Sequence, residues 1–384
     1  MTDILVLGAG YTGLAAAIRV ATRTRRVGAR VTLVNASSRF TERLRLHQSA
    51  TGQRLADHSI EDVIAGTGIR FVRARVAALD PDGHRVRLAG GEVLAYDKLI
   101  YALGAVTDTS VPGVTEHAHT YDDHDAALRL AARLETLADG GTVVVAGGGL
   151  TGVESAAELA ESHPGLRVVL LSRGRPGAML GERAQAYLDR ALARLGVRVR
   201  QDVRVTKVLP DAVELADGEL IHSDATLWNA GTRGLPLAAE SGLETDERGR
   251  IVVDPFLRSV SHPDVYAVGD AAAVPLPFGV LHGTCQSGIP TGLHAGDTLA
   301  DGLLGGRPRP FRFGYYHQPV SLGRRDAVIQ FVRPDDSPRR GYLTGRWAVA
   351  YKETVSGSPL PTFRLLKRGL VPVGAFRLSA GLGG

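Results

Sequence analysis

Residues 3–18 read DILVLGAGYTGLAAAI, an apolar run that passes through three glycines into an alanine-rich run. The apolar run predicts a buried strand and the alanine-rich run a helix, with Gly8-x-Gly10-x-x-Gly13 as the turn between them. In such a turn the first glycine permits the tight bend, the second lets a pyrophosphate approach the backbone, and the third lets the helix pack on the strand. Free N–H groups at the helix start then favour phosphate. The segment therefore predicts a dinucleotide-binding unit.

The same pattern occurs a second time in the chain. Residues 142–160 read TVVVAGGGLTGVESAAELA, with glycines at Gly147, Gly149 and Gly152. Each copy is followed by a further apolar run that predicts a strand: VTLVN (31–35) and RVVLLS (167–172). One such turn is a weak signal, whereas two copies in the same strand–turn–helix context are strong. We therefore expect an α/β fold with two Rossmann-like dinucleotide-binding domains and a small C-terminal segment.

The composition narrows the class of protein. The 384 residues are 44% hydrophobic and 22% charged, which is ordinary for a globular chain of two or three domains. The net charge of +5 is spread along the chain, so we expect no nucleic-acid partner. A single cysteine, Cys285, excludes an internal disulfide and a CxxC redox pair. We expect no metal site.

The first strand leaves no room for a signal peptide and no apolar run is long enough to span a membrane, so we expect a cytoplasmic protein.

Four motifs in order resemble those of the two-dinucleotide-binding-domain flavoproteins of the glutathione reductase type. They are the two glycine turns, YDKLIYALGA (96–105) and VYAVGDAA (265–272). The resemblance covers about residues 3–300 and implies FAD at the first turn and NAD(P)H at the second. We expect the following residues to bind the two cofactors: Gly8, Gly10, Tyr11, Thr12, Gly13, Asn35, Arg45, Gln48, Ala102, Gly104, Gly147, Gly149, Leu150, Thr151, Gly152, Arg173, Arg175, Gly231, Gly269 and Asp270. The resemblance places Asp270 on the ribityl-phosphate side of the flavin.

The resemblance also implies a division into domains. Residues 1–115 and 256–312 would form the FAD domain, and residues 116–255 the inserted NAD(P)H domain. Residues 313–384 would form a C-terminal segment that covers the flavin and the acceptor site.

Within this group the chain is most similar to type II NADH dehydrogenases and the apoptosis-inducing-factor-like quinone reductases. The similarity is carried by QSATG (48–52), the second glycine turn, SLGRRDAVIQF (321–331) and AVAYKE (348–353). A disulfide reductase is excluded because a dithiol relay needs two cysteines.

The similarity implies two residues at the flavin. Glu154 would lie near the flavin and Lys352 would face its isoalloxazine ring. The alternatives are a helix-start carboxylate favoured by the helix dipole and a solvated surface lysine.

Two positions depart from the usual acidic residue after the second strand of each unit. Asn35 still offers a carbonyl to the FAD ribose, at a cost of about 1 kcal/mol. Arg173 and Arg175 follow Ser172 in the second unit, where arginine accommodates a 2′-phosphate. We therefore predict NADPH over NADH, the alternative being two surface arginines.

The acceptor side matches the family only in part. In TCQSGIPTG (284–292) Gln286 matches the quinone-pocket segment of type II dehydrogenases, but Pro290 and Thr291 replace its later glutamines. Cys285 is expected to be a small buried hydrophobe rather than a charge-transfer partner of the flavin.

Two histidines have open roles. His47, in ERLRLHQ (42–48), would be a proton donor or a structural histidine, and the same alternatives hold for His282.

The tail, FRLLKRGLVPVGAFRL (363–378), mixes apolar and basic residues. Because Gly369, Pro372 and Gly374 interrupt any long helix, we expect weak or no contact with a membrane surface.

Together these features predict an FAD-dependent oxidoreductase that passes hydride from NADPH (or NADH) to FAD and electrons on to a quinone or quinone-like small molecule. The alternatives are a tailoring oxidoreductase acting on a small aromatic metabolite and an electron-transfer reductase for a protein partner. The oligomeric state is left open.

Overall fold

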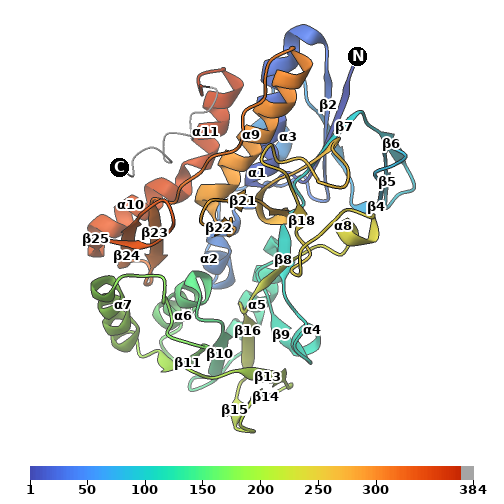
Figure 1. Cartoon of the computed structure of the whole chain (residues 1–384). Helices are drawn as coiled ribbons and strands as arrows, with labels where there is room; N and C mark the ends of the chain where they lie inside the picture. Colours follow the sequence, from blue (N-terminus) through green and yellow to red (C-terminus); the bar gives the residue numbers. More distant parts are fainter. Residues whose placement is uncertain (373–384) are drawn as a thin grey trace.

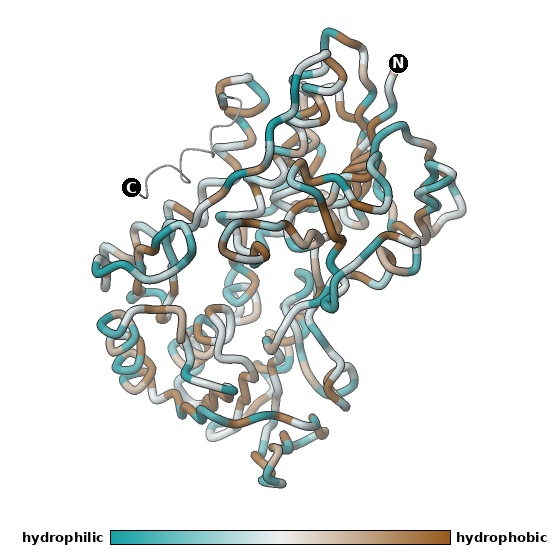
Figure 2. Tube along the Cα trace, in the orientation of Figure 1, coloured by the Kyte–Doolittle hydropathy of each residue, from teal (hydrophilic) through white to brown (hydrophobic). Residues whose placement is uncertain are grey.

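The computed structural model describes residues 1–372, apart from the side chain of Cys285. Two parallel sheets form the upper and lower halves of the molecule, and a C-terminal unit lies against both (Figure 1). Apolar residues concentrate along the central strands of the sheets (Figure 2). The expected α/β fold with two Rossmann-like units is confirmed.

The first sheet has the strand order β19-β7-β1-β2-β3, and all neighbouring strands are parallel. Its strands are β1 (Asp3–Leu7), β2 (Arg30–Asn35), β3 (Arg70–Arg73), β7 (Lys98–Tyr101) and β19 (Val265–Ala267). Helix α1 (Tyr11–Thr24) joins β1 to β2 and packs against α9 (Cys285–Leu303). Strand β1 is almost fully buried, and Val31, Leu33 and Val34 of β2 are buried, because both faces of a parallel sheet are covered.

The second sheet repeats this design with the order β12-β11-β10-β16-β9. Its strands are β9 (Ala118–His119), β10 (Thr142–Ala146), β11 (Arg167–Leu171), β12 (Arg198–Arg200) and β16 (Ala225–Trp228). Its helices are α5 (His124–Glu135), α6 (Leu150–Ser162) and α7 (Glu182–Arg194). In both sheets the glycine turn joins the central strand to a helix, so the internal repeat of the sequence is a repeat of structure.

Short antiparallel elements decorate the two sheets. They are β4 (Val76–Asp80), β5 (Arg85–Leu88) and β6 (Val93–Ala95); β13 (Val205–Val208), β14 (Ala212–Leu215) and β15 (Leu220–His222); and the pairs β8 (Ala105–Thr107) with β17 (Thr232–Gly234) and β21 (Pro275–Leu276) with β22 (Gly279–Val280). Strand β18 (Ile251–Val252) pairs in parallel with β20 (Ala272–Ala273). The short helices are α2 (Leu46–Ala50), α3 (Ile60–Ile64), α4 (Val114–His117), α8 (Leu237–Glu240), η1 (Arg25–Val27), η2 (Arg43–Arg45) and η3 (Gly269–Ala271).

The C-terminal unit connects the two cores. It consists of the antiparallel strands β23 (His317–Ser321), β24 (Ala327–Val332) and β25 (Pro338–Thr344), followed by α10 (Gly345–Gly357) and α11 (Pro359–Lys367). Val320 and Val328 belong to the apolar core around α6, whereas Phe363 and Leu366 of α11 belong to the core around α1. This unit therefore holds a fixed place beside both nucleotide-binding units.

The tail motif is only partly within the described residues. Helix α11 ends at Lys367, and Gly374 lies outside the described part of the chain, together with the last basic residue of the motif, Arg377. Within residues 1–372 no helix is both long and apolar enough to cross a membrane. The weak or absent membrane-surface contact stays a prediction, as do the domain boundaries given above.

Candidate cofactor and active site

The first glycine turn has the geometry that the sequence predicts. Gly8 has φ +97°, and a Cβ atom there would lie 2.3 Å from the carbonyl oxygen of Ala102. A Cβ on Gly13 would lie 1.9 Å from the carbonyl oxygen of Gly8, whereas a Cβ on Gly10 would meet nothing within 4 Å. The first and third glycines are thus required by packing, and the second borders open space that a pyrophosphate can enter.

The second turn repeats this geometry atom by atom. A Cβ on Gly147 would lie 2.6 Å from the carbonyl oxygen of Asn229, and one on Gly152 would lie 1.8 Å from that of Gly147. Gly149 again borders open space. The first glycine of each turn donates its N–H to the end of the neighbouring strand, at 2.8 Å in both cases. Two sites of the same design are therefore present.

Asn35 supports the first turn. Its Oδ1 accepts the N–H of Ala9 at 3.0 Å, and its Nδ2 donates to the carbonyl oxygen of Ser37 at 2.8 Å. Two predicted neighbours, Tyr11 and Thr12, open helix α1, and Tyr11 packs edge-on against Phe40 with 5.1 Å between ring centroids. Asn35 thus fixes the loop as well as lying at the predicted ribose position.

Asp270 lies at the carboxyl end of β19, in the short helix η3 after Gly269. The Gly283 backbone approaches it so closely that a Cβ there would lie 2.1 Å from Oδ1. Burial raises the pKa of Asp270, and Arg43 and Arg250 oppose the shift.

Arg43 is a candidate cofactor residue that the sequence reasoning missed. Its Nη1 donates to the carbonyl oxygen of Ala105 at 2.9 Å, beside Gly104, and its Nη2 lies 3.8 Å from Asp122. A guanidinium at the carboxyl ends of parallel strands suits a phosphate or a flavin carbonyl. The sequence RLR (43–45) contains two arginines, and no feature of the sequence distinguishes them. Arg45, the predicted cofactor contact, instead forms an ion pair with Glu353 of α10 at 2.9 Å.

These residues fit a bound FAD, because the first turn is open at Gly10 and polar groups converge at the strand ends. When bound, FAD supplies the ability to accept a hydride and pass its electrons on.

The second turn shows which arginine is free. Ser172 is buried, and Arg175 pairs with Asp189 of α7 at 2.5 Å. Arg173 is exposed and has no partner among the described residues. The other predicted contacts, Leu150, Thr151 and Gly231, lie at the start of α6 and at the end of the loop after β16.

The three predicted catalytic residues come together from three separate segments. Lys352 of α10 pairs with Oε1 of Glu154, which also accepts the N–H of Ser321 at 2.9 Å. Both side chains are nearly buried, 12% and 11% exposed. His47 of α2 is buried beside this pair, and burial lowers its pKa to about 4, with Glu154 opposing the shift. Its Nε2 has no hydrogen-bond partner among the described residues.

Helix α6 presents two more carboxylates to the C-terminal hairpin. Glu158 is buried and accepts hydrogen bonds from Gln53 Nε2 at 2.6 Å and Arg324 Nε at 2.8 Å. Glu161 accepts the backbone N–H of Arg324. The predicted cofactor contact Gln48 is buried in α2 next to this group. The β23–β24 turn is therefore fixed on the helix that carries Glu154.

A second buried histidine lies close by. His317 is fully buried, and its Nδ1 is 2.8 Å from the hydroxyl of Tyr351. Burial lowers the pKa of His317 to about 4, and Lys352 contributes in the same direction. No motif in the sequence marks it, because its contacts come from residues far apart in the chain.

In the segment matched to the quinone pocket (284–292), Gln286 and Thr291 form hydrogen bonds within the protein. Gln286 Nε2 donates to the carbonyl oxygen of His317 at 2.7 Å, and its Oε1 accepts from Tyr316 N at 3.3 Å. Thr291 Oγ1 accepts the N–H of Gly269 at 3.0 Å. Both ends of the Gln286 amide thus hold Tyr316 and His317, at the start of strand β23. The predicted burial of the Cys285 side chain falls outside what the structure describes.

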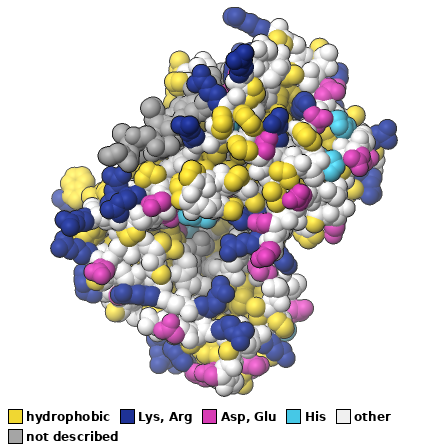
Figure 3. Space-filling view, in the orientation of Figure 1, with side chains coloured by type: hydrophobic (Ala, Val, Ile, Leu, Met, Phe, Trp, Pro, Cys, Tyr) yellow, Lys and Arg dark blue, Asp and Glu magenta, His cyan; other side chains and the backbone are white. Residues whose placement is uncertain are grey.

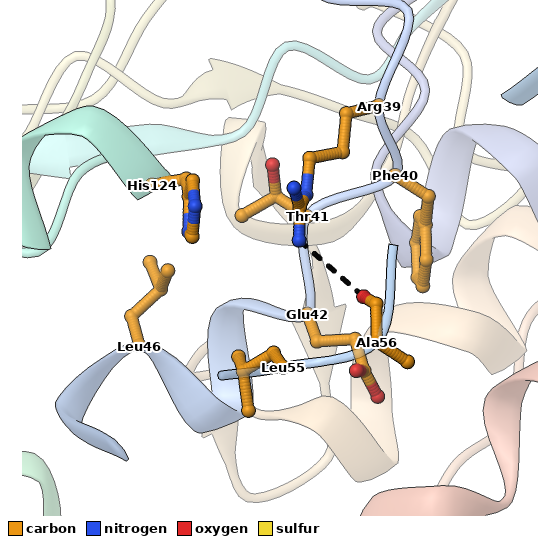
Figure 4. A pocket seen from close by; sticks show the side chains of 8 residues that line it. All are labelled: Arg39, Phe40, Thr41, Glu42, Leu46, Leu55, Ala56 and His124. Carbon is orange, nitrogen blue, oxygen red and sulfur yellow. Dashed lines mark hydrogen bonds between the residues drawn. The ribbon is translucent and has the colours of Figure 1, made fainter. Parts of the chain in front are cut away.

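A small pocket borders the first unit (Figure 4). It is lined by Arg39, Phe40, Thr41, Glu42, Leu46, Leu55, Ala56 and His124. Arg39 spans it and donates to the carbonyl oxygen of Ala56 at 3.4 Å. None of the lining residues belongs to a glycine turn, and Glu42 and Leu46 flank the segment that contains Arg43 and Arg45. Among the described residues, no group of three or more His, Cys, Asp or Glu side chains could hold a metal ion.

Fold and site together define a flavoprotein oxidoreductase with two dinucleotide-binding units. Residues 2–296 match the pyridine nucleotide-disulphide oxidoreductase family, and the chain belongs to that family.

Several known proteins are similar to the chain. It is 32% identical to an NADH dehydrogenase-like protein of Mycobacterium tuberculosis, over 85% of this chain and 87% of that protein. It is 27% identical to the type II NADH:quinone oxidoreductase of Staphylococcus haemolyticus, over 85% and 88% of the two chains. Among solved structures, the sulfide:quinone oxidoreductase of Aquifex aeolicus shares the fold with a TM-score of 0.81 at 18% identity, over 97% and 93% of the chains. The NDH2 of Plasmodium falciparum, solved with NADH, has a TM-score of 0.78 at 15% identity, over 97% and 99%.

The predicted class is therefore confirmed. The chain is a flavin-dependent oxidoreductase enzyme that uses a pyridine nucleotide, and FAD with a nicotinamide dinucleotide are the cofactors expected of its family.

Proposed function

We propose that this enzyme passes a hydride from NADPH to FAD and the electrons on to a quinone-type small molecule. The observation that carries the proposal is the pair of matching turns, each open at its second glycine and closed at its first and third. The Glu154–Lys352 pair joins the second of these units to the C-terminal unit. Glu154, Lys352 and His47 are the proposed catalytic residues.

The preference for NADPH is supported by Arg173. Because Arg175 is held by Asp189, Arg173 is the arginine free to form paired hydrogen bonds with a 2′-phosphate. Ser172 brings no negative charge to repel that phosphate. Lys and Arg side chains, interspersed with Asp and Glu, lie near the notch between the two halves (Figure 3).

The quinone acceptor is supported by the relatives, since one similar enzyme is a type II NADH:quinone oxidoreductase. One observation favours a second candidate. The nitrogen and the oxygen of the Gln286 amide both form hydrogen bonds within the protein. The acceptor would therefore meet a different surface here than in the quinone pocket of type II dehydrogenases. This difference suits a tailoring oxidoreductase that acts on small aromatic metabolites.

The test is anaerobic stopped-flow reduction of the flavin by NADPH and NADH in parallel, followed by mixing with candidate acceptors. We expect NADPH to reduce the flavin faster than NADH does at limiting concentration, and quinones to reoxidise the reduced flavin. Flavin reduction without reoxidation by any quinone would favour the tailoring enzyme instead.

A further inference from the structure

His282 is held rigidly although its side chain is 50% exposed. It lies between β22 and α9, and its ring stacks on Tyr315 with 4.3 Å between centroids and an angle of 9°. The hydroxyl of Tyr315 accepts the N–H of His282 at 3.0 Å and donates to its carbonyl oxygen at 2.9 Å. One tyrosine thus fixes both the backbone and the ring of this histidine.

Asp336 fixes the rotation of the His282 ring by holding one of its nitrogens. Its carboxylate is 3.3 Å from His282 Nε2 and accepts Gln318 Nε2 at 2.6 Å. Asp336 lies in the turn between β24 and β25 with φ +69°, a left-handed conformation that is uncommon for a non-glycine residue. With Nε2 turned to Asp336, the other ring nitrogen, Nδ1, has no partner among the described residues.

The pair lies next to the proposed flavin site. Gly283, the next residue, packs against the carboxylate of Asp270. On the other side, the hairpin β21–β22 exposes Phe278 (39%) and Val280 (51%), and the Phe278 ring lies 6.1 Å from that of Tyr315. An oriented imidazole therefore lies between an exposed apolar surface and the flavin-binding strand ends.

We infer that His282, oriented by Asp336, is the proton donor to the electron acceptor, and that the acceptor is an apolar ring compound with a carbonyl oxygen that packs against Phe278 and Val280. This inference rests on the proposed function.

Reduction of a quinone to its hydroquinone consumes two electrons and two protons. Reduced nicotinamide supplies both electrons and one proton as a hydride. The second proton passes from Nδ1 of the His282 imidazolium to the acceptor oxygen: the N–H bond breaks and an O–H bond forms. The half-exposed ring then regains a proton from water.

The charges around His282 set the direction of its pH dependence. Partial burial lowers its pKa, and Asp336 opposes this shift. The other groups near it are the Tyr315 phenol, Asp270, and Arg250, which donates to the carbonyl oxygen of Leu281 at 3.2 Å. Because the imidazolium is the donor, acceptor reduction should slow as the pH rises through the pKa of His282.

The experiment uses FAD-loaded protein, NADPH as reductant, and two acceptors, menadione and ferricyanide. Menadione takes up protons, whereas ferricyanide takes up electrons alone. The variant is His282→Gln. The control is His222→Gln, whose histidine lies 3.3 Å from Asp224 and is 61% exposed, but on β15 of the other unit.

The inference expects His282→Gln to slow reoxidation by menadione by at least about tenfold and to abolish its pH dependence. Flavin reduction by NADPH and reoxidation by ferricyanide should stay within about twofold of the wild type, as should all rates of His222→Gln. Asp336→Asn should lower the pKa of His282, measured from its ring C–H resonance by NMR, because the carboxylate no longer stabilises the imidazolium.

Three outcomes would overturn the inference. They are an unchanged menadione rate in His282→Gln, an equal loss with ferricyanide, which would indicate a structural role, and wild-type protein that does not reduce menadione at all. Failure of NADPH to reduce the flavin would instead reject the proposed function itself.

Discussion

Two arginines separated by one residue have different surroundings. Arg175 forms an ion pair with Asp189, whereas the Arg173 guanidinium is exposed and unpaired among the described residues. The sequence predicted a phosphate-binding role for both, because the ion pair with α7 depends on a fold that returns Asp189 to the same place. We therefore expect Arg173 to contribute more than Arg175 to the choice between NADPH and NADH.

Arg173→Ala should raise the KM for NADPH about 10- to 100-fold, since a charge-assisted hydrogen bond contributes about 1.5–3 kcal/mol. The KM for NADH should change little. Arg175→Ala is the matched control and should affect NADPH far less. Steady-state kinetics with both coenzymes measures this, and an equal loss with NADH would show that Arg173 does not bind a 2′-phosphate.

The Glu154–Lys352 pair allows a test at a single contact. Removing one partner leaves the other charge nearly buried and unpaired, which costs about 3–5 kcal/mol. We expect Glu154→Gln and Lys352→Met each to lower the free energy of unfolding, and the double variant to lose less than the sum of the two. Urea unfolding of all four proteins gives the coupling, and strictly additive losses would contradict the pairing.

At the scale of elements, the glycine turns were predictable and the C-terminal contacts were not. A strand, a turn and a helix are contiguous in sequence, and each glycine has a steric reason that local spacing reveals. The Lys352–Glu154 contact joins residues 198 positions apart, and Arg324 reaches Glu158 across 166. Only the resemblance pointed to Lys352, and nothing marked Arg324, Arg43 or His317.

Two neighbouring glycines should respond in opposite ways to alanine. Gly13→Ala should destabilise the fold, because the new Cβ would lie 1.9 Å from the carbonyl oxygen of Gly8. Gly10→Ala should fold with almost unchanged stability, yet lose FAD, because the methyl group occupies the space that the pyrophosphate needs. Thermal unfolding of the FAD-free proteins and titration with FAD measure both effects. Normal FAD binding by a folded Gly10→Ala protein would refute the assignment of this turn.

At the scale of the whole molecule, the proposed active site depends on all three units. His47 comes from the first, Glu154 from the second and Lys352 from the C-terminal unit, whose apolar residues lie in both cores. The α/β fold could be predicted from the sequence because it follows from the repeated turns, whereas the meeting of these residues depends on how the units pack.

This packing makes the molecule sensitive to acid. Burial lowers the pKa values of His47 and His317 to about 4, so the unfolded chain binds protons that the folded chain does not. Stability from these groups is complete above the ordinary histidine pKa and is lost as the pH falls from about 6.5 towards 4, with about 2 kcal/mol lost per histidine between pH 7 and pH 5. Urea unfolding of His317→Asn should lose correspondingly less stability over this range than the wild type does. An acid response equal to that of the wild type would contradict a neutral buried His317, and the exposed His222→Gln serves as the control.

The central claim is that the two matching turns hold two different nucleotides. It is tested most directly by anaerobic addition of NADPH to FAD-loaded wild-type and Gly149→Ala proteins, with the flavin absorbance followed. We expect NADPH to bleach the flavin of the wild type, whereas Gly149→Ala retains its FAD but is not bleached at the same NADPH concentration. A wild-type protein that takes up no FAD, or a Gly149→Ala protein that is bleached as readily as the wild type, would contradict the account.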